Sequence, residues 1–194
     1  MEPVFEENRT YQGVDFKENP LPKGEYERCR FTGCDFAHAN LGGLKFLDCT
    51  FTSCNLSLAT LAKTVFQGAH FKDCKMLGLH FEACNPFGLS FGFENCSLNH
   101  SSFYRLKAKQ TVFKNCPLQE VDFTEADLTG AVFDHCDLER ATFAGTVLEK
   151  ADFRTAYHYT LDPETNRIRK ARFSLPHAVG LLRKYDIQID EAYG

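Results

Sequence analysis

The chain has 194 residues, enough for one domain with a hydrophobic core, and its composition is unusual in having 19 phenylalanines, nine cysteines and no tryptophan. The net charge of -4 argues against a strongly basic nucleic-acid-binding protein. The sequence has no apolar run long enough to span a membrane and no signal peptide at its acidic N-terminus, so we expect a cytoplasmic protein.

After a lead-in over residues 1–10, a large apolar residue falls on every fifth position. The rhythm starts at Tyr11, shifts by two residues within 85–93 and continues to Phe153. Ala108 is the one small residue at these central positions. A helix repeats every 3.6 residues and a strand every two, so neither alone explains a period of five.

Five residues can instead form one side of a square coil. The central residue and the residue two before it then share the inward face of a short extended segment, while the other three face water. Four sides make one coil, and successive coils stack as parallel strands ~4.8 Å apart. Residues one coil apart should form columns, as Phe113, Phe133 and Phe153 would, and each buried ring contributes on the order of 1.5–3 kcal/mol.

All nine cysteines occupy the position two before a central residue, where Ala, Thr, Ser and Val also occur. Free cysteine behaves as a small hydrophobic residue, so we interpret these side chains as part of the core. The CxxC pair typical of zinc sites is absent, and we expect neither a metal nor a cofactor. Cys34, Cys54 and Cys74 would stack within disulfide reach, although a reducing cytoplasm argues against a bond.

The repeating units resemble those of a known family. Four of them are similar to the A(D/N)LXX consensus of pentapeptide repeat proteins: ADLTG (126–130), CDLER (136–140), ATFAG (141–145) and ADFRT (151–155). The resemblance extends from residue 11 to about 156. It implies an all-β fold, a right-handed quadrilateral β-helix, which we place over residues 11–173 with the register slip near 85–93.

The last segment, 174–194, loses the five-residue rhythm. Ser174 suits a helix N-cap, the apolar residues after it follow helical spacing, and the final isoleucines alternate like a short strand. This segment resembles the C-terminal cap of the quinolone-resistance members of the family, which pairs two subunits tail to tail. The resemblance implies a homodimer with these interface residues: Leu175, Val179, Leu182, Tyr185, Ile187 and Ile189. A cap that only shields the last coil is the alternative.

The sequence predicts a binding protein with no catalytic residues. It contains no Gly-rich phosphate loop, nucleophile elbow or HExxH motif. Some family members resemble B-DNA in size and charge and bind type II topoisomerases such as gyrase, so the resemblance implies a DNA-mimicking modulator of these enzymes. The candidate partner-binding acids are Glu120, Asp122, Glu125, Asp127, Asp134, Asp137 and Glu139. An ordinary solvated surface is the alternative interpretation.

The register slip is the remaining candidate site. Pro86 takes the place of a central apolar residue and Phe87 adds an extra ring. The slip is either a bulge that kinks the stack or a small recognition knob built on Phe87, which we include among the partner-binding candidates. The alternative function for the whole chain is a rigid scaffold for an unrelated protein partner. We expect neither function to involve direct contact with nucleic acid or a membrane.

Overall fold

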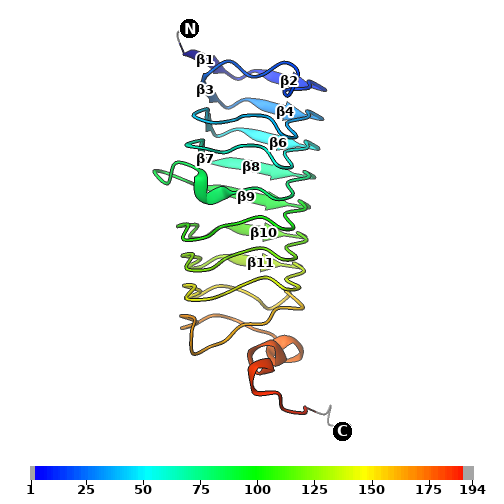
Figure 1. Cartoon of the computed structure of the whole chain (residues 1–194), viewed down its shortest axis with the longest axis vertical. Helices are drawn as coiled ribbons and strands as arrows, with labels where there is room; N and C mark the ends of the chain where they lie inside the picture. Colours follow the sequence, from blue (N-terminus) through cyan, green and yellow to red (C-terminus); the bar gives the residue numbers. More distant parts are fainter. Residues whose placement is uncertain (1–2, 190–194) are drawn as a thin grey trace.

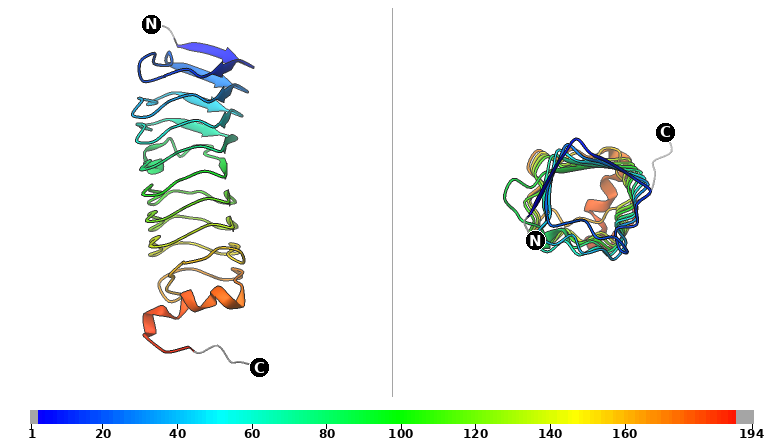
Figure 2. Two further views of the ribbon diagram at one scale, coloured as in Figure 1. Left: turned by 90° about the vertical axis from the view of Figure 1, so that its right-hand side faces the viewer. Right: turned by 90° about the horizontal axis from the view of Figure 1, so that it is seen from above.

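The computed structural model describes residues 3–189, over which the chain winds into a stack of coils (Figure 1). Seen along the stack, the coils superpose into a four-sided outline (Figure 2). All strand pairs are parallel, and each joins a residue to one about a full coil later in the sequence. The predicted all-β solenoid is therefore confirmed.

Two faces of the stack carry regular strands. One face has a four-stranded sheet: β1 (Val4–Glu7), β3 (Gly24–Glu27), β5 (Lys45–Leu47) and β7 (Val65–Gln67). The next face has a seven-stranded sheet: β2 (Thr10–Gln12), β4 (Arg30–Thr32), β6 (Thr50–Thr52), β8 (Ala69–Lys72), β9 (Phe91–Glu94), β10 (Val112–Lys114) and β11 (Val132–Asp134). Elsewhere the coils are held by isolated parallel bridges, and one 3-10 turn, η1 (Phe81–Ala83), interrupts the pattern.

The stack begins earlier than the rhythm of large residues predicts. β1 pairs with β3 in the register Val4 to Gly24, so residues 4–10 lie in the first coil and not in a separate lead-in. The rhythm of large inward residues does not reveal this first side, because its large residue, Phe5, is exposed and lies outside the interior. Tyr11, where the rhythm of large residues starts, therefore lies on the second side of the stack.

The interior consists of columns of rings, as the spacing predicts. Phe113 is fully buried and stacks on Phe93 and Phe133 with ring centroids 5.3 and 5.1 Å apart. Rings in neighbouring columns meet edge to face, for example Phe113 and Phe123 at 6.0 Å. Both offset stacking and edge-to-face contacts are favourable aromatic geometries, so the columns stabilise one another laterally.

The cysteines fill the small inward position. All nine are buried and free, which confirms the core interpretation. Cys54 and Cys74 each donate a weak hydrogen bond, 3.4 Å long, to the carbonyl oxygen of a residue in the coil above, Phe31 and Phe51 respectively. Six of them form one continuous column through the register slip: Cys34, Cys54, Cys74, Cys96, Cys116 and Cys136.

The C-terminal segment closes the stack with two short 3-10 helices, η2 (Leu175–Leu181) and η3 (Arg183–Tyr185). Gly180 lies directly on Tyr159 of the last coil, where an added Cβ would clash with the Tyr159 carbonyl oxygen, and its own carbonyl accepts the Leu161 N–H at 3.1 Å. Lys184 forms ion pairs with Asp162 and Glu164 at 2.6 and 2.7 Å. Backbone contact and charge pairing together dock this cap.

Two expectations about the cap need correction. The Ser174 side chain makes no capping hydrogen bond, and the turns after it are 3-10 rather than α-helical, with a proline at their start. In the described part of the chain, Ile187 and Ile189 belong to no strand. A strand needs a neighbouring edge to pair with, and the cap itself already covers the last coil.

Candidate functional site

The register slip forms a loop, residues 85–90, that projects from the side of the stack (Figure 1). Pro86 has no N–H to donate to a neighbouring coil, and the Asn85 side chain accepts the Phe87 N–H at 2.9 Å, which turns the chain outward. Gly88, with φ +70°, supplies the left-handed turn, and Ser90 returns by donating its N–H to the Phe66 carbonyl at 2.9 Å. Phe87 is therefore 86% exposed at the tip.

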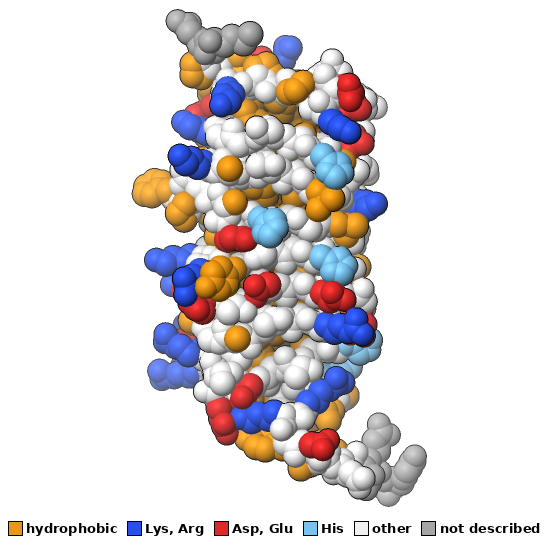
Figure 3. All heavy atoms as spheres, viewed as in Figure 1, with side chains coloured by type: hydrophobic (Ala, Val, Ile, Leu, Met, Phe, Trp, Pro, Cys, Tyr) orange, Lys and Arg blue, Asp and Glu red, His pale blue; other side chains and the backbone are white. Residues whose placement is uncertain are grey.

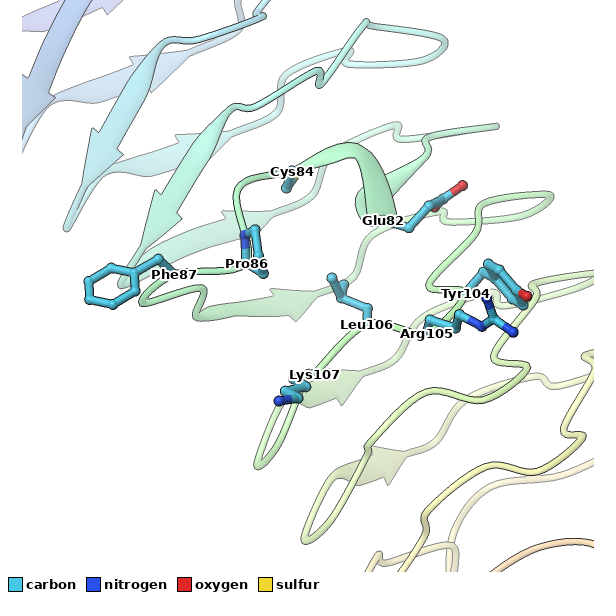
Figure 4. A pocket seen from close by; sticks show the side chains of 8 residues that line it. All are labelled: Glu82, Cys84, Pro86, Phe87, Tyr104, Arg105, Leu106 and Lys107. Carbon is cyan, nitrogen blue, oxygen red and sulfur yellow. The ribbon is translucent and has the colours of Figure 1, made fainter.

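A cavity of about 680 Å³ lies beside this loop (Figure 4). Its lining residues come from the loop coil and the next coil: Glu82, Cys84, Pro86, Phe87, Tyr104, Arg105, Leu106 and Lys107. Leu106 and Cys84 lie in the middle, Arg105 and Tyr104 lie at one end, and the Phe87 ring points away at the other end (Figure 4). The site thus joins an apolar floor to a cationic rim.

The guanidinium at the rim is held in place. Arg105 pairs with Glu125 through two hydrogen bonds of 2.7 and 3.1 Å and lies 4.8 Å from the centre of the Tyr104 ring. The pairing keeps the pKa of the Glu125 carboxyl below its ordinary value. Lys107 has no ion-pair partner among residues 3–189, so its ammonium is available to a ligand.

The predicted acids do not gather on one face. Asp122, Asp127 and Asp137 come just before central residues on three different sides, and each accepts a backbone N–H two residues later, at 2.8, 3.2 and 3.2 Å. Figure 3 shows acidic and basic side chains interspersed on the face in view. The acids form a mixed surface rather than a stripe on that face.

Most of these acids are paired across coils. Glu120 pairs with Arg140 at 3.3 Å, Asp127 with Lys109 at 3.2 Å, and Asp137 contacts His158 at 2.9 Å. Asp134 accepts a hydrogen bond from Thr155 and contacts His135 at 2.8 Å, and these contacts hold the pKa of its carboxyl below the ordinary value. In the described chain, Asp122 and Glu139 are the predicted acids without a cationic contact.

The predicted dimer residues all lie on the cap and expose apolar surface. Leu175 is 89% exposed, and the others are between 39% and 56% exposed: Val179, Leu182, Tyr185, Ile187 and Ile189. The cap covers the end of the stack with its other side, through Gly180 and Lys184. A soluble domain seldom exposes this many large apolar residues together, so the outer side of the cap is a second candidate surface.

Sequence reasoning missed the part of the cavity contributed by Tyr104, Arg105 and Lys107. A signal for it was present, because the large-residue rhythm fails at Ala108, one coil after Pro86. Two consecutive positions in one column that lack a large apolar residue indicate a place where neighbouring coils do not pack against each other. Among residues 3–189, no three potential metal-ligating side chains come together, and no helix is both long and apolar enough to traverse a bilayer.

Comparison with known proteins identifies relatives of this architecture. A family model described as a pentapeptide repeat region matches residues 25–92 and 89–157. A trypsin-treated variant of QnrB1, described as a plasmid-mediated fluoroquinolone resistance protein, is 21% identical, with a TM-score of 0.54 over 97% of this chain and 92% of that chain.

A second structural relative is HetL from the cyanobacterium Nostoc sp. strain PCC 7120, described as a pentapeptide repeat protein involved in heterocyst differentiation regulation. It is 16% identical, with a TM-score of 0.47 over 89% of this chain and 85% of that chain. No curated protein matches the chain. The likeness to the QnrB1 variant shows a shared fold and leaves the function to be argued from the surface.

Proposed function

This chain belongs to the pentapeptide repeat family, and from that premise we propose that it is a non-enzymatic binding protein whose partner is another protein. The observation that carries this proposal is Phe87, a ring 86% exposed on a loop braced by Asn85 and Ser90. Exposed aromatic rings beside a cavity are typical anchors of protein interfaces. A rigid solenoid presents such a loop at little entropic cost.

A type II topoisomerase such as gyrase is the partner that the family resemblance favours. In the DNA-mimic account, carboxylates of this protein occupy the positive surface that otherwise binds DNA. The acids free to do so are Asp122 and Glu139, because neighbouring coils pair most of the others. The pairing makes Phe87 the more important contact and limits how far the charge of DNA is reproduced.

A supercoiling assay tests this partner. Purified protein should inhibit or modify gyrase supercoiling at micromolar concentration, and the effect should weaken with rising salt. An Asp122→Asn/Glu139→Gln variant should weaken it, whereas a matched Asp15→Asn/Glu18→Gln variant at the other end of the stack should not. No effect at any concentration would exclude a topoisomerase partner.

A scaffold for an unrelated protein is the second candidate function. The cross-coil ion pairs favour this function, because a surface of balanced charge does not imitate the negative charge that a DNA-binding partner recognises. Affinity capture from the native host with wild-type protein and with a Phe87→Ser variant tests this function. A partner lost specifically with the variant supports a scaffold that binds through the loop, and identical captures would contradict it.

We also propose that two subunits pair through their caps. The exposed apolar residues of the cap support this arrangement, in which both copies bury the same surface. Light scattering should give twice the mass of one chain, and Leu182→Glu/Ile187→Glu should give one chain. Leu58→Glu, at an exposed corner, is the matched control and should not change the mass. The buried free thiols are compatible with a reducing compartment, and we propose the cytoplasm.

A further inference from the structure

The cavity beside Phe87 coincides with a break in the hydrogen-bond ladder between two coils. Just before the break the ladder is regular: Ser102 donates its N–H to the Leu79 carbonyl at 2.8 Å, and Phe81 donates to the Ser102 carbonyl at 2.9 Å. The same pattern, moved five residues along, would join Lys107 N–H to the Cys84 carbonyl and residue 86 to the Lys107 carbonyl. Residue 86 is proline and cannot donate, and the loop carries it away.

The break leaves backbone groups without partners at the cavity. Within residues 3–189, neither the N–H nor the C=O of Lys107 makes a hydrogen bond, and the carbonyls of Tyr104 and Cys84 accept none. The opposite side of this segment is normally paired. The Asp127 N–H donates to the Leu106 carbonyl at 2.9 Å, and the Ala108 N–H donates to the Asp127 carbonyl at 2.9 Å. Lys107 therefore forms a one-residue strand edge that follows the turn at Tyr104 and Arg105, where Arg105 has φ +56°.

The side chains around this edge define what would fit. The Glu82 carboxylate points away from Lys107 (Figure 4) and contacts the His80 ring nitrogen at 2.8 Å, so it takes no part in the fit. Lys107 supplies an unpaired positive charge, and Leu106 supplies an apolar floor. Such a combination suits an extended peptide, whose alternating N–H and C=O groups pair with an edge while an acidic side chain meets the lysine.

We propose that this gap binds an extended, acidic peptide segment of a partner protein by adding it to the edge at Lys107. The peptide donates an N–H to the Lys107 carbonyl and accepts from the Lys107 N–H, which replaces the missing rung. One of its carboxylates pairs with the Lys107 ammonium.

The test uses the full chain, ¹⁵N-labelled, and three capped pentapeptides. The first is Val-Glu-Val-Glu-Val, the second has the same sequence with the central amide N-methylated, and the third has lysines in place of the glutamates. In the free protein the Lys107 amide proton should exchange rapidly. The first peptide should shift the Lys107 resonance and slow its exchange at least tenfold, and the other two should bind at least tenfold more weakly.

Variants separate the charge from the backbone. Lys107→Gln should weaken binding of the first peptide at least threefold. The N-methylated peptide should still bind to this variant more weakly than the first peptide does. Lys150→Gln, an exposed lysine two coils further along, should bind as the wild type does. The proposal is overturned if the first peptide causes no shift at millimolar concentration, or if N-methylation or charge reversal makes no difference. A gyrase effect could persist after either result, so this test is independent of the topoisomerase proposal.

Discussion

At the scale of single residues, the corner two places after each central side chain is the most constrained position. Most of these corners have positive φ whether or not they are glycine, for example Gly33 at 60° and Lys63 at 60°. A left-handed backbone costs a non-glycine residue roughly 1–2 kcal/mol. Each exposed non-glycine corner therefore holds a small amount of strain that the stacking on both sides maintains.

This strain predicts opposite effects of one substitution at two lysines. Lys63→Gly should raise the free energy of unfolding by ~0.5–1 kcal/mol, because glycine adopts the corner conformation without strain. Lys72→Gly, in strand β8, should lower it by ~0.5–1 kcal/mol, because glycine there only adds entropy to the unfolded chain. Chemical denaturation of both variants measures the difference. Changes of the same sign would contradict the corner argument.

The buried thiols predict a loss of stability in alkali. Burial raises the pKa of the Cys84 thiol to about 12, and burial is also the main reason why the pKa of Cys49 rises to about 12. The folded protein then holds these protons to higher pH than the unfolded chain does. The stabilisation is fully present below the unfolded pKa, near ~8.5, and is lost as pH rises toward the folded value.

Denaturation at a series of pH values checks this expectation. The free energy of unfolding should fall between pH 9 and 11, and a Cys49→Ala/Cys84→Ala variant should show a shallower fall. The thiols should also resist a disulfide reagent until the protein is unfolded, because the thiolate is the reactive form. An identical slope in wild type and variant would show that other groups cause the alkaline loss.

At the scale of elements, the cap depends on a close backbone approach that only glycine permits. Gly180→Ala should push the cap away from Tyr159 and release the hydrogen bond from Leu161. Hydrogen exchange at the Leu161 amide should become faster, while amides of β10 keep their protection. His177→Ala, at an exposed position of η2, should leave the exchange of Leu161 unchanged. Unchanged exchange in the Gly180 variant would contradict the packing account.

The sequence predicted the regular sides of the stack because each central residue repeats the same requirement, a large side chain pointing inward. It could not predict the path of the loop at Pro86, since one missing donor allows several detours. The cap was predicted as a helix and a strand, but proline and glycine in Leu175–Leu181 restrict it to 3-10 turns. Short apolar segments without a repeat leave such choices to tertiary contacts.

The ion pairs of the acidic residues could have been found from the period alone. Arg105 with Glu125 and Glu120 with Arg140 are each twenty residues apart, which places both partners on the same corner of successive coils. Local charge counts along the sequence overlook such pairs, because they treat as neighbours residues that lie on different faces. The candidate acids were thus predicted as exposed, but their neutralisation was not.

At the scale of the whole molecule, stability comes from contacts between neighbouring coils. Each coil buries its rings against the next one, so removing a complete coil should leave the remaining contacts intact. Deletion of residues 111–130 brings Phe93 over Phe133 and Phe103 over Phe143, which repeats stacking already present in the protein. Deletion of residues 111–117 instead breaks the five-residue rhythm.

Comparing these two deletions is the most direct test of the coil account. The twenty-residue deletion should remain folded, with the circular dichroism of the wild type and a maximum dimension in X-ray scattering shorter by ~5 Å. The seven-residue deletion should be far less stable, although it removes fewer residues. If the longer deletion unfolds the protein and the shorter one does not, the chain is not built from twenty-residue coils.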